Sequence, residues 1–347
     1  MLLLNKENIK AAAIAIFLLV TVPIFSLQLG DGTDKDTYTP IKVMEDVKQV
    51  YITDYYNTFI IKNDNSLWAT GYNKNDLLGV GIKDDIHTFM KVMDNVKSVS
   101  NYTILKTDGT LWAMRMNEGL IDKIDDNVVK VSAGYGIMYI KADNTLWGYG
   151  ENYKGSFGTG LRGETYPVPK KLRDNVIDVY NESIYSLIIT TDNELFISGV
   201  HYLPKPYTSP FYSFIKFADN VRAVSNGFYI TKDNSLYAFG YSAQGALGVG
   251  DITENILPTL IMNDVKSVSS TQSCTFILKM DGSLYGCGGR TPNYFGSLGT
   301  GDTKPVLHPI LLQKKVKEIS VGDSHTAFIK EDGSLWVCGA NSYPPLM

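Results

Sequence analysis

Short apolar runs and tight polar turns alternate along most of the chain, and one phrase of this kind occurs seven times. Its clearest copy is Asp332-Gly-Ser-Leu-Trp336, which follows the apolar-rich run Thr326-Ala-Phe-Ile-Lys330. The six other copies begin at Asp64, Asp108, Asp143, Asp192, Asp233 and Asp281. Two strand-like runs joined by an Asp-Gly or Asp-Asn turn are a strong signal for a β-hairpin. The pattern therefore predicts seven hairpins in one register.

The segments around each hairpin repeat as well. A run such as Val316-Lys-Glu-Ile-Ser320 precedes the hairpin, and in most units a glycine-rich loop of the type Leu-Gly-x-Gly follows it. The units recur at intervals of roughly 35 to 50 residues, a period typical of propellers, solenoids and arrays. Because each unit supplies three clear strands and often a fourth, we predict an all-β fold, a seven-bladed propeller. We expect the leucine of each phrase to face the blade core and the aromatic residue after it to fill the gap to the next blade.

The seventh unit lacks its glycine-rich loop and fourth strand after Gly339-Ala-Asn341. A matching stretch stands near the amino terminus, from Leu29-Gly-Asp-Gly-Thr33 to Thr39-Pro-Ile-Lys-Val43. We therefore expect residues 29–43 to complete the seventh blade, which would remove exposed sheet edges.

The seventh unit also shows what the repeat resembles. Its inner run, its His-Thr start, its Asp-Gly-Ser-Leu-Trp phrase and the Gly-x-Asn that follows are similar to the regulator of chromosome condensation repeat. The resemblance covers residues 27–347 and implies a seven-bladed propeller. This chain departs from the family pattern in that only the seventh unit has the family's histidine, His325, and the second and fourth units lack the glycine-rich loop. The short units and apparent export are closest in style to secreted bacterial members such as beta-lactamase inhibitory protein II, which caps a partner enzyme with one face.

Residues 1–26 have the character of a targeting segment. Lys6 and Lys10 precede an uncharged, mostly apolar run from Ala11 to Phe25, as in a secretory signal peptide. No Ala-x-Ala cleavage site follows, so an uncleaved membrane anchor is the alternative. In either case we expect the propeller, residues 27–347, to lie outside the cytoplasm, secreted or tethered to the outer side of the cell membrane.

Composition and charge narrow the functional classes. The formal net charge is −4, and the basic residues are spread along the chain, so nucleic acid is not expected as a partner. The four histidines lie in separate repeats and no Cys/His metal spacing exists, so we predict neither a metal site nor a cofactor. Cys287 and Cys338 occupy the same place in successive repeats, and we interpret them as small buried residues rather than a bridge. The turn aspartates occur in every hairpin and are interpreted as turn formers.

Aromatic residues gather in the turns after the inner runs and in the loops on the same side of the propeller. We predict a binding face that contains the following side chains: Tyr55, Tyr56, Tyr72, Tyr102, Tyr135, Tyr185, Tyr202, Tyr207, Phe211, Tyr212, Phe228 and Tyr241. Exposed aromatic residues commonly carry binding energy at protein interfaces. The alternative is that these rings fold down between the blades.

These observations favour an extracytoplasmic propeller that binds another protein through one aromatic-rich face and is not an enzyme. One alternative is a carbohydrate-active enzyme with carboxylates in the propeller channel. A second is an inhibitor of a secreted beta-lactamase-like enzyme. Guanine-nucleotide exchange, an activity of the nuclear family member, is not expected because no matching insertion is present, and no nucleotide is expected to bind.

Overall fold

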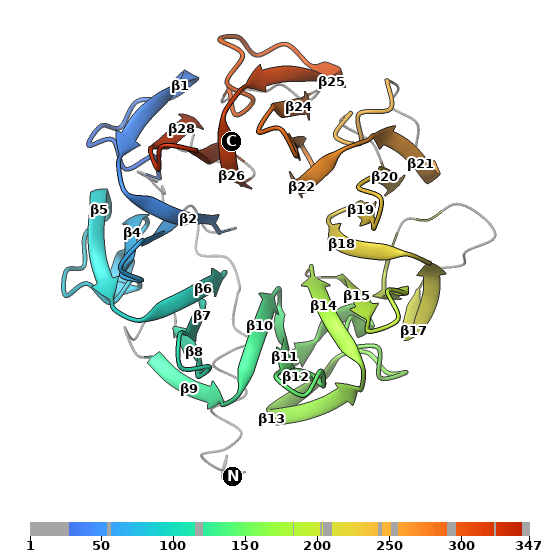
Figure 1. Ribbon diagram of the computed structural model, residues 1–347. Coiled ribbons are helices and arrows are strands. Elements are labelled where there is room, and N and C mark those ends of the chain that lie inside the picture. The colour runs from blue at the N-terminus through green and yellow to red at the C-terminus, as the bar shows by residue number, and fades with distance from the viewer. Residues whose placement is uncertain are drawn as a thin grey trace, which may run out of the picture.

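The computed structural model describes residues 28–53, 57–114, 121–182, 184–201, 203, 210–241, 245–250, 256–289, 296–322 and 324–341. Their strands form seven four-stranded antiparallel sheets set around a central axis (Figure 1), which confirms the predicted seven-bladed propeller. Two short 3-10 turns, η1 (Lys74–Asp76) and η2 (Tyr153–Gly155), interrupt the loops. The described residues include no helix with the length and apolar character needed to cross a bilayer. The expected signal or anchor, residues 1–26, lies outside them.

The strands follow one another through the blades in chain order, with the last blade shared between the two ends. Blades 1 to 3 are β2 (Val47–Ile52), β3 (Asn57–Lys62), β4 (Leu67–Gly71), β5 (Ile86–Met93); β6 (Val96–Ser100), β7 (Thr103–Lys106), β8 (Leu111–Met114), β9 (Ile121–Asp125); and β10 (Val128–Ala133), β11 (Gly136–Lys141), β12 (Leu146–Asn152), β13 (Glu164–Arg173). Blades 4 to 6 are β14 (Val176–Asn181), β15 (Tyr185–Thr190), β16 (Leu195–Gly199), β17 (Phe211–Ala218); β18 (Val221–Ser225), β19 (Phe228–Thr231), β20 (Leu236–Gly240), β21 (Ile256–Met262); and β22 (Val265–Ser270), β23 (Cys274–Lys279), β24 (Leu284–Gly288), β25 (Val306–Gln313). Blade 7 is β26 (Val316–Val321), β27 (His325–Lys330), β28 (Leu335–Gly339) and β1 (Thr37–Met44).

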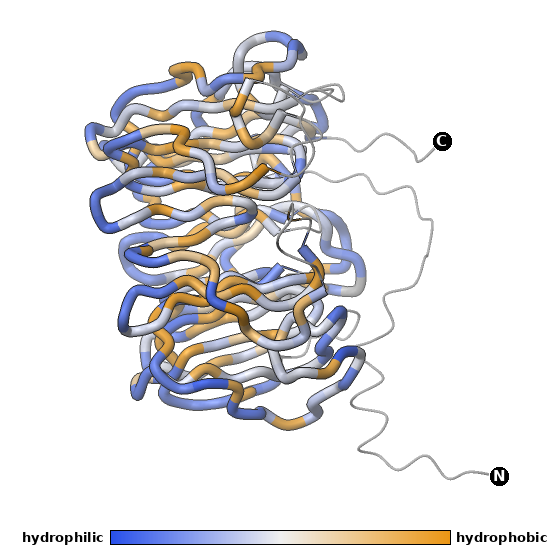
Figure 2. Tube along the Cα trace, turned by 90° about the vertical axis from the view of Figure 1, so that its right-hand side faces the viewer, coloured by the Kyte–Doolittle hydropathy of each residue, from blue (hydrophilic) through white to orange (hydrophobic). Residues whose placement is uncertain are grey.

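Two faces of the ring differ in what they carry. The first strand of each blade lies nearest the axis and the fourth lies at the rim (Figure 1). The hairpin turns between second and third strands, together with the turns between blades, lie on one face, which we call the turn face; Figure 2 shows their hydrophilic tips along its left edge. The opposite face carries the turns after the first strands and the longer loops between third and fourth strands. We call it the loop face.

Left-handed backbone turns hold the turn face together. The second residue of each hairpin turn has a positive φ, as in Asn65 (64°), and so does a residue between blades, as in Asn95 (63°). Glycine, asparagine and aspartate tolerate this conformation best, which explains most of these positions. The amide of Val96, at the start of blade 2, donates to the Asn65 carbonyl at 2.9 Å, and Val47 donates to Gly333 at 3.0 Å in the same way. The hairpin turns therefore also join each blade to the next.

The leucine and the aromatic residue of the repeated phrase lie on opposite faces of their sheet. The aromatic residue does not face the blade that was expected. Leu67 joins the hydrophobic cluster that blade 1 shares with blade 2. Trp68 packs instead on the cluster that blade 1 shares with blade 7, and Trp336 likewise packs towards blade 6. The expectation that the aromatic residue fills the gap to the next blade was wrong. Successive side chains of a strand point to opposite faces of its sheet, so the leucine faces the following blade and the aromatic residue the preceding one.

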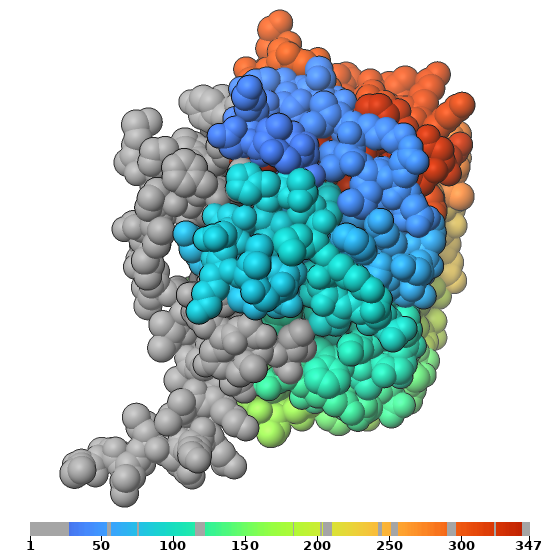
Figure 3. Space-filling view, turned by 90° about the vertical axis from the view of Figure 1, so that its left-hand side faces the viewer, coloured from blue at the N-terminus to red at the C-terminus, as the bar shows by residue number. Residues whose placement is uncertain are grey.

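The ring closes through the pairing of its two ends. Strand β1 pairs antiparallel with β28, with Ile41 opposite Val337. Figure 3 shows the amino-terminal strand packed beside the carboxyl-terminal blade. The amide of Leu29 donates to the side-chain oxygen of Asn341 at 3.0 Å, and the Asn341 side-chain nitrogen donates to the Thr33 carbonyl at 2.7 Å. The prediction that residues 29–43 complete the seventh blade is confirmed.

The same asparagine clamp occurs inside other blades. In blade 1 the side-chain oxygen of Asn73 accepts from the Leu78 amide at 2.8 Å, and its nitrogen donates to the Ile82 carbonyl at 2.8 Å. The Gly-x-Asn of the repeat therefore fixes the shape of the glycine-rich loop. In blade 7 this local clamp has become the bond that joins the ends of the ring.

Candidate functional site

The structure divides the twelve predicted binding-face aromatics into three groups. Tyr55, Tyr56, Tyr202 and Tyr207 lie outside the described residues. Tyr102, Tyr185 and Phe228 are buried, at 9%, 5% and 1% exposure. Tyr72, Phe211 and Tyr212 are partly exposed, whereas Tyr135 and Tyr241 are each 48% exposed.

The buried group corrects the expectation of an exposed face at these three positions. The Tyr102 hydroxyl accepts a hydrogen bond from the Asn57 side chain of the preceding blade at 2.8 Å. The Tyr185 hydroxyl donates to Asn226 of the following blade at 2.5 Å. These rings fold down between blades because burying an aromatic ring there is favourable once its polar tip finds a partner.

Of the remaining aromatics, Tyr72 packs against the core of blades 1 and 2, Phe211 packs against the core of blades 4 and 5, and Tyr241 follows β20 of blade 5. The other two, Tyr135 and Tyr212, belong to a cluster at the junction of blades 3 and 4. We call this cluster the tyrosine patch; it consists of Tyr135, Tyr153, Lys154, Leu161, Arg162 and Tyr212. The rings of Tyr135 and Tyr153 meet edge to face, with centroids 4.9 Å apart. Tyr212 packs over Gly155, where a β-carbon would stand 2.5 Å from the tyrosine ring. Only glycine fits there, so this residue lets blade 4's tyrosine lie against blade 3's loop.

Two cationic side chains cover the patch. The Lys154 ammonium lies 5.1 Å from the Tyr153 ring centroid, and the Arg162 guanidinium lies 5.7 Å from that of Tyr212. Within the part of the chain that the structure describes, neither cation pairs with a carboxylate. Lys154 holds a left-handed backbone (φ 57°), which costs a non-glycine residue about 1 kcal/mol. Leu161, beside Arg162, is 54% exposed. The patch therefore presents aromatic, aliphatic and positively charged groups to solvent.

The loop beneath the patch is firmly held. The side-chain oxygen of Asn152 accepts from the Phe157 amide at 2.9 Å, and its nitrogen donates to the Leu161 carbonyl at 3.1 Å. The Gly160 amide donates to the Tyr212 carbonyl at 2.7 Å, which links the loop to β17 of the next blade. A rigid scaffold of this kind lowers the conformational entropy lost when a partner binds.

Comparison with known proteins identifies the repeat. Two family models of the regulator of chromosome condensation (RCC1) repeat match the chain, one at residues 281–329 and one at residues 316–343. The chain carries RCC1 repeats. Together with the seven blades, this makes the protein an RCC1-repeat propeller.

Known relatives share only part of the chain. X-linked retinitis pigmentosa GTPase regulator of Canis lupus familiaris is 34% identical over 122 residues, 33% of this chain and 12% of that protein. The ultraviolet-B receptor UVR8 of Arabidopsis thaliana is 29% identical over 118 residues, 32% of this chain and 26% of the receptor. The matched region thus spans far less than two thirds of either relative.

Solved structures share the fold over most of the ring. Prp20p from Saccharomyces cerevisiae superposes with a TM-score of 0.72 at 15% identity, covering 98% of this chain and 96% of Prp20p. Human WBSCR16 gives a TM-score of 0.69 at 16% identity, covering 88% and 89% of the two chains. At these identities the similarity concerns the fold alone.

Sequence reasoning missed four members of the patch in this RCC1-repeat propeller: Tyr153, Lys154, Leu161 and Arg162. The available signal was a departure from the repeat. The loop of blade 1 reads Asn73-Lys-Asn-Asp76, whereas the loop of blade 3 reads Asn152-Tyr-Lys-Gly155. The blade 3 loop thus has a tyrosine where blade 1 has Lys74, and its lysine stands one position later.

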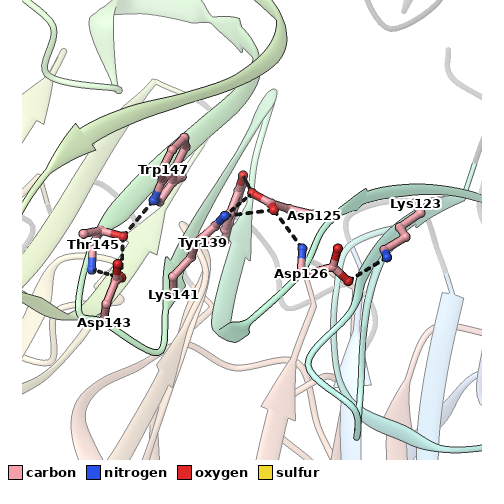
Figure 4. A network of polar contacts seen from close by, with 8 residues as sticks. All are labelled: Lys123, Asp125, Asp126, Tyr139, Lys141, Asp143, Thr145 and Trp147. Atoms are coloured by element: carbon pink, nitrogen blue, oxygen red, sulfur yellow. Dashed lines mark hydrogen bonds and ion pairs between the residues drawn. The ribbon is translucent and has the colours of Figure 1, made fainter.

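A polar network joins blades 2 and 3, where the glycine-rich loop is missing. Asp125 accepts hydrogen bonds from the Tyr139 hydroxyl at 2.6 Å and from Lys141 at 2.9 Å (Figure 4). Burial acts to raise the pKa of Asp125, but the hydrogen bonds from Lys141 and Tyr139 outweigh it and hold the pKa below its usual value. A carboxylate with a lowered pKa and two fixed donors stabilises the blade junction; it is not poised as a general acid.

Other chemical groups bear on the alternative of an enzyme. Burial raises the pKa of Glu318, and this carboxylate accepts a hydrogen bond from the Val50 amide at 3.2 Å. No cluster of three or more potential metal ligands occurs among the described residues.

Cys287 and Cys338 are unbridged, and burial raises the pKa of each thiol to about 12. Each sulfur contacts a loop carbonyl of the preceding blade, Ala246 at 3.5 Å and Ser297 at 3.4 Å respectively.

Proposed function

We propose that this RCC1-repeat propeller is a scaffold that binds another protein through its loop face, centred on the tyrosine patch. The observation that carries the proposal is the cluster of Tyr135, Tyr153 and Tyr212 beside two cations, neither of which pairs with a carboxylate among the described residues. Tyrosine and arginine are enriched among the residues that dominate binding energy at protein interfaces. The clamped loop beneath them supplies the preorganisation that such a site needs.

Proteins of the same fold support the proposal by example. One solved structure is Kap60 bound to yeast RCC1 (Prp20), and another reports binding of Prp20p to Gsp1p and histones. These partners belong to those proteins. What the examples contribute is that a ring of this architecture can present a surface to a protein.

A site-specific photocrosslinking experiment tests the loop face against the turn face. A photoreactive phenylalanine analogue replaces either Leu161, 54% exposed in the patch, or Met280, 58% exposed beside the hairpin turn of blade 6. We expect a discrete crosslinked protein from position 161 and none from position 280 in cells that express the chain. Replacing both Tyr135 and Tyr153 by alanine should abolish the crosslink, since a hot-spot residue contributes about 2 kcal/mol or more.

The result would count against the proposal if both positions crosslinked equally or if position 161 gave no product while the ring was folded. Near-ultraviolet circular dichroism of the double variant is the control. Tyr135 and Tyr153 are not core residues, so the spectrum should keep the shape of a packed ring.

We also propose that the ring works outside the cytoplasm, on the basis of the basic and apolar pattern in residues 1–26. Protease added to intact cells should then degrade the propeller after mild outer-layer permeabilisation, while a cytoplasmic marker stays intact. Protection of the propeller under those conditions would place it inside.

A further inference from the structure

The outer strands carry a repeated ion pair in five of the seven blades. In each of these blades, a lysine of the fourth strand stands opposite the aromatic residue of the third: Lys42 and Trp336, Lys91 and Trp68, Lys123 and Trp112, Lys171 and Trp147, Lys216 and Phe196. Each lysine bonds to a carboxylate three residues later, at 2.6 to 2.8 Å: Glu45, Asp94, Asp126, Asp174 and Asp219 respectively. Lysine at such a position keeps an exposed sheet edge soluble and discourages pairing with other strands.

Blades 5 and 6, which are neighbours in the ring (Figure 1), break this rule together. The residue opposite Tyr237 is Leu260, and the residue opposite Tyr285 is Leu311. These leucines are 50% and 46% exposed. On the same two strands Leu257 is 49% exposed and Ile310 is 43% exposed. Aliphatic side chains thus replace the periodic charge on one part of the rim.

The acidic partner of the pair is replaced as well. Three residues after Leu260 stands Asn263, and three residues after Leu311 stands Lys314. Lys314 and Lys315 are both exposed, and neither pairs with a carboxylate in the described part of the chain. Asp264, just before β22, pairs with Lys279 at 3.8 Å. Glu331 is the neighbour of Lys315, since its amide donates to the Lys315 carbonyl at 2.9 Å. The aliphatic surface is therefore flanked by two exposed lysines that form no ion pair among the described residues.

We propose that this surface, the leucine rim, docks on the surface of an anionic lipid bilayer. It consists of Leu257, Leu260, Ile310 and Leu311 with Lys314 and Lys315. Aliphatic side chains enter the interfacial region of a membrane, while adjacent lysines are attracted to anionic headgroups. The aliphatic residues lie on blades 5 and 6, the two lysines follow β25 of blade 6, and neither feature is needed to close the ring. The proposal depends neither on the tyrosine patch nor on residues 1–26.

Two other occupants fit the rim less well. A protein partner usually engages tyrosine, tryptophan or arginine at its hot spots, and leucine is under-represented there. A second copy paired strand to strand meets Pro258 in β21 and Pro309 in β25, which cannot donate to a ladder. Two copies that met through their leucine rims would also place Lys314 and Lys315 of one copy near Lys314 and Lys315 of the other. An anionic bilayer satisfies both the aliphatic groups and the lysines.

A fluorescent label on the rim tests the proposal in the full chain. The three native cysteines are buried, so a surface cysteine can be labelled selectively with an environment-sensitive dye. Thr259→Cys places the dye between Leu257 and Leu260. Lys170→Cys places it at the same register position in blade 3, since Thr259 pairs with Ala238 and Lys170 pairs with Gly148. Any contribution of residues 1–26 to vesicle binding acts on both labelled proteins equally.

We expect the emission at position 259 to shift to the blue and intensify with vesicles of phosphatidylcholine containing phosphatidylserine, and the emission at position 170 to stay unchanged. The double variant Leu260→Lys, Leu311→Lys gives blades 5 and 6 the lysine that the five other blades have at this position. Each leucine lost should weaken the response about tenfold, because its burial in lipid is forfeited. Lys314→Ala with Lys315→Ala should remove the preference for phosphatidylserine.

Several outcomes would overturn the proposal. One is an equal response at positions 259 and 170, and another is a response that survives the double Leu→Lys variant. A change at position 259 without vesicles that grows with protein concentration would show a second copy on the rim instead. An unaltered thermal transition of the Leu→Lys variant excludes misfolding as the cause of a lost response.

Discussion

Lowering the pH from 6.5 to 4.5 should cost the ring about 2 kcal/mol of its free energy of unfolding through one side chain, His325. This histidine is 1% exposed, and its Nε2 lies 2.8 Å from the Thr58 hydroxyl of blade 1. The hydroxyl donates to the Gln28 carbonyl at 2.7 Å, so it accepts from a neutral Nε2–H. Burial lowers the pKa of His325 from 6.5 to about 3.

The sign follows from which state binds the proton. Between pH 6.5 and about 3 the unfolded chain protonates this histidine while the folded ring keeps it neutral. Stability is therefore complete above pH 6.5 and falls as the pH drops through that window. Urea unfolding at several pH values measures the slope.

His325→Gln is the matched variant, because an amide can still donate to Thr58 but does not titrate. Its unfolding free energy should vary much less between pH 6.5 and 4.5 than that of the parent chain. Equal slopes for the two proteins would show that another group carries the pH dependence. Hydrogen bonds lower the pKa values of the turn aspartates Asp64, Asp108, Asp143, Asp233, Asp281 and Asp332, so these groups act mainly below pH 4.5.

Asn341→Ala should lower the free energy of unfolding by about 3 kcal/mol, since it removes several hydrogen bonds and leaves the buried Leu29 amide without its acceptor. Asn73→Ala removes the corresponding bonds of blade 1 and serves as the control. It should cost less, because the blade 1 loop stays tethered at both ends by the chain. The Asn341 clamp instead joins residues that are far apart in sequence.

Hydrogen exchange distinguishes the two variants further. In Asn341→Ala the amides of β1 should exchange much faster than those of β5, because the end strand opens without unfolding the other blades. In Asn73→Ala the protection of β1 should remain. If both variants lost the same stability and kept β1 protected, the clamp would not be what holds the ring closed.

The tyrosine patch and the leucine rim occupy neighbouring parts of the ring, which suggests a joint role. The tyrosine patch lies on blades 3 and 4, and the leucine rim lies on blades 5 and 6. A ring that binds a protein with one sector and a bilayer with the next would hold its partner at the membrane surface. The crosslinking and fluorescence experiments read the two surfaces separately, so either can fail alone.

The sequence by itself determined the hairpins, their number and the closure of the ring. These features depend on local chemistry: an Asp-Gly or Asp-Asn pair accepts the left-handed backbone of a tight turn wherever it stands, as Asn65 and Gly333 show. The last unit lacks its fourth strand, and an extra strand of the same type stands near Ile41. The two could be matched because each repeat contains the same set of strands.

Only the tertiary structure decided which neighbour each side chain meets. Alternation along a strand separates Leu67 from Trp68 but does not say which blade lies on which side. Burial of Tyr102 depended on Asn57 in the preceding blade, and the tyrosine patch required a loop of blade 3 to meet Tyr212 of blade 4. Contacts between repeats depend on how the blades are set around the axis, and that geometry is fixed by packing over the whole ring.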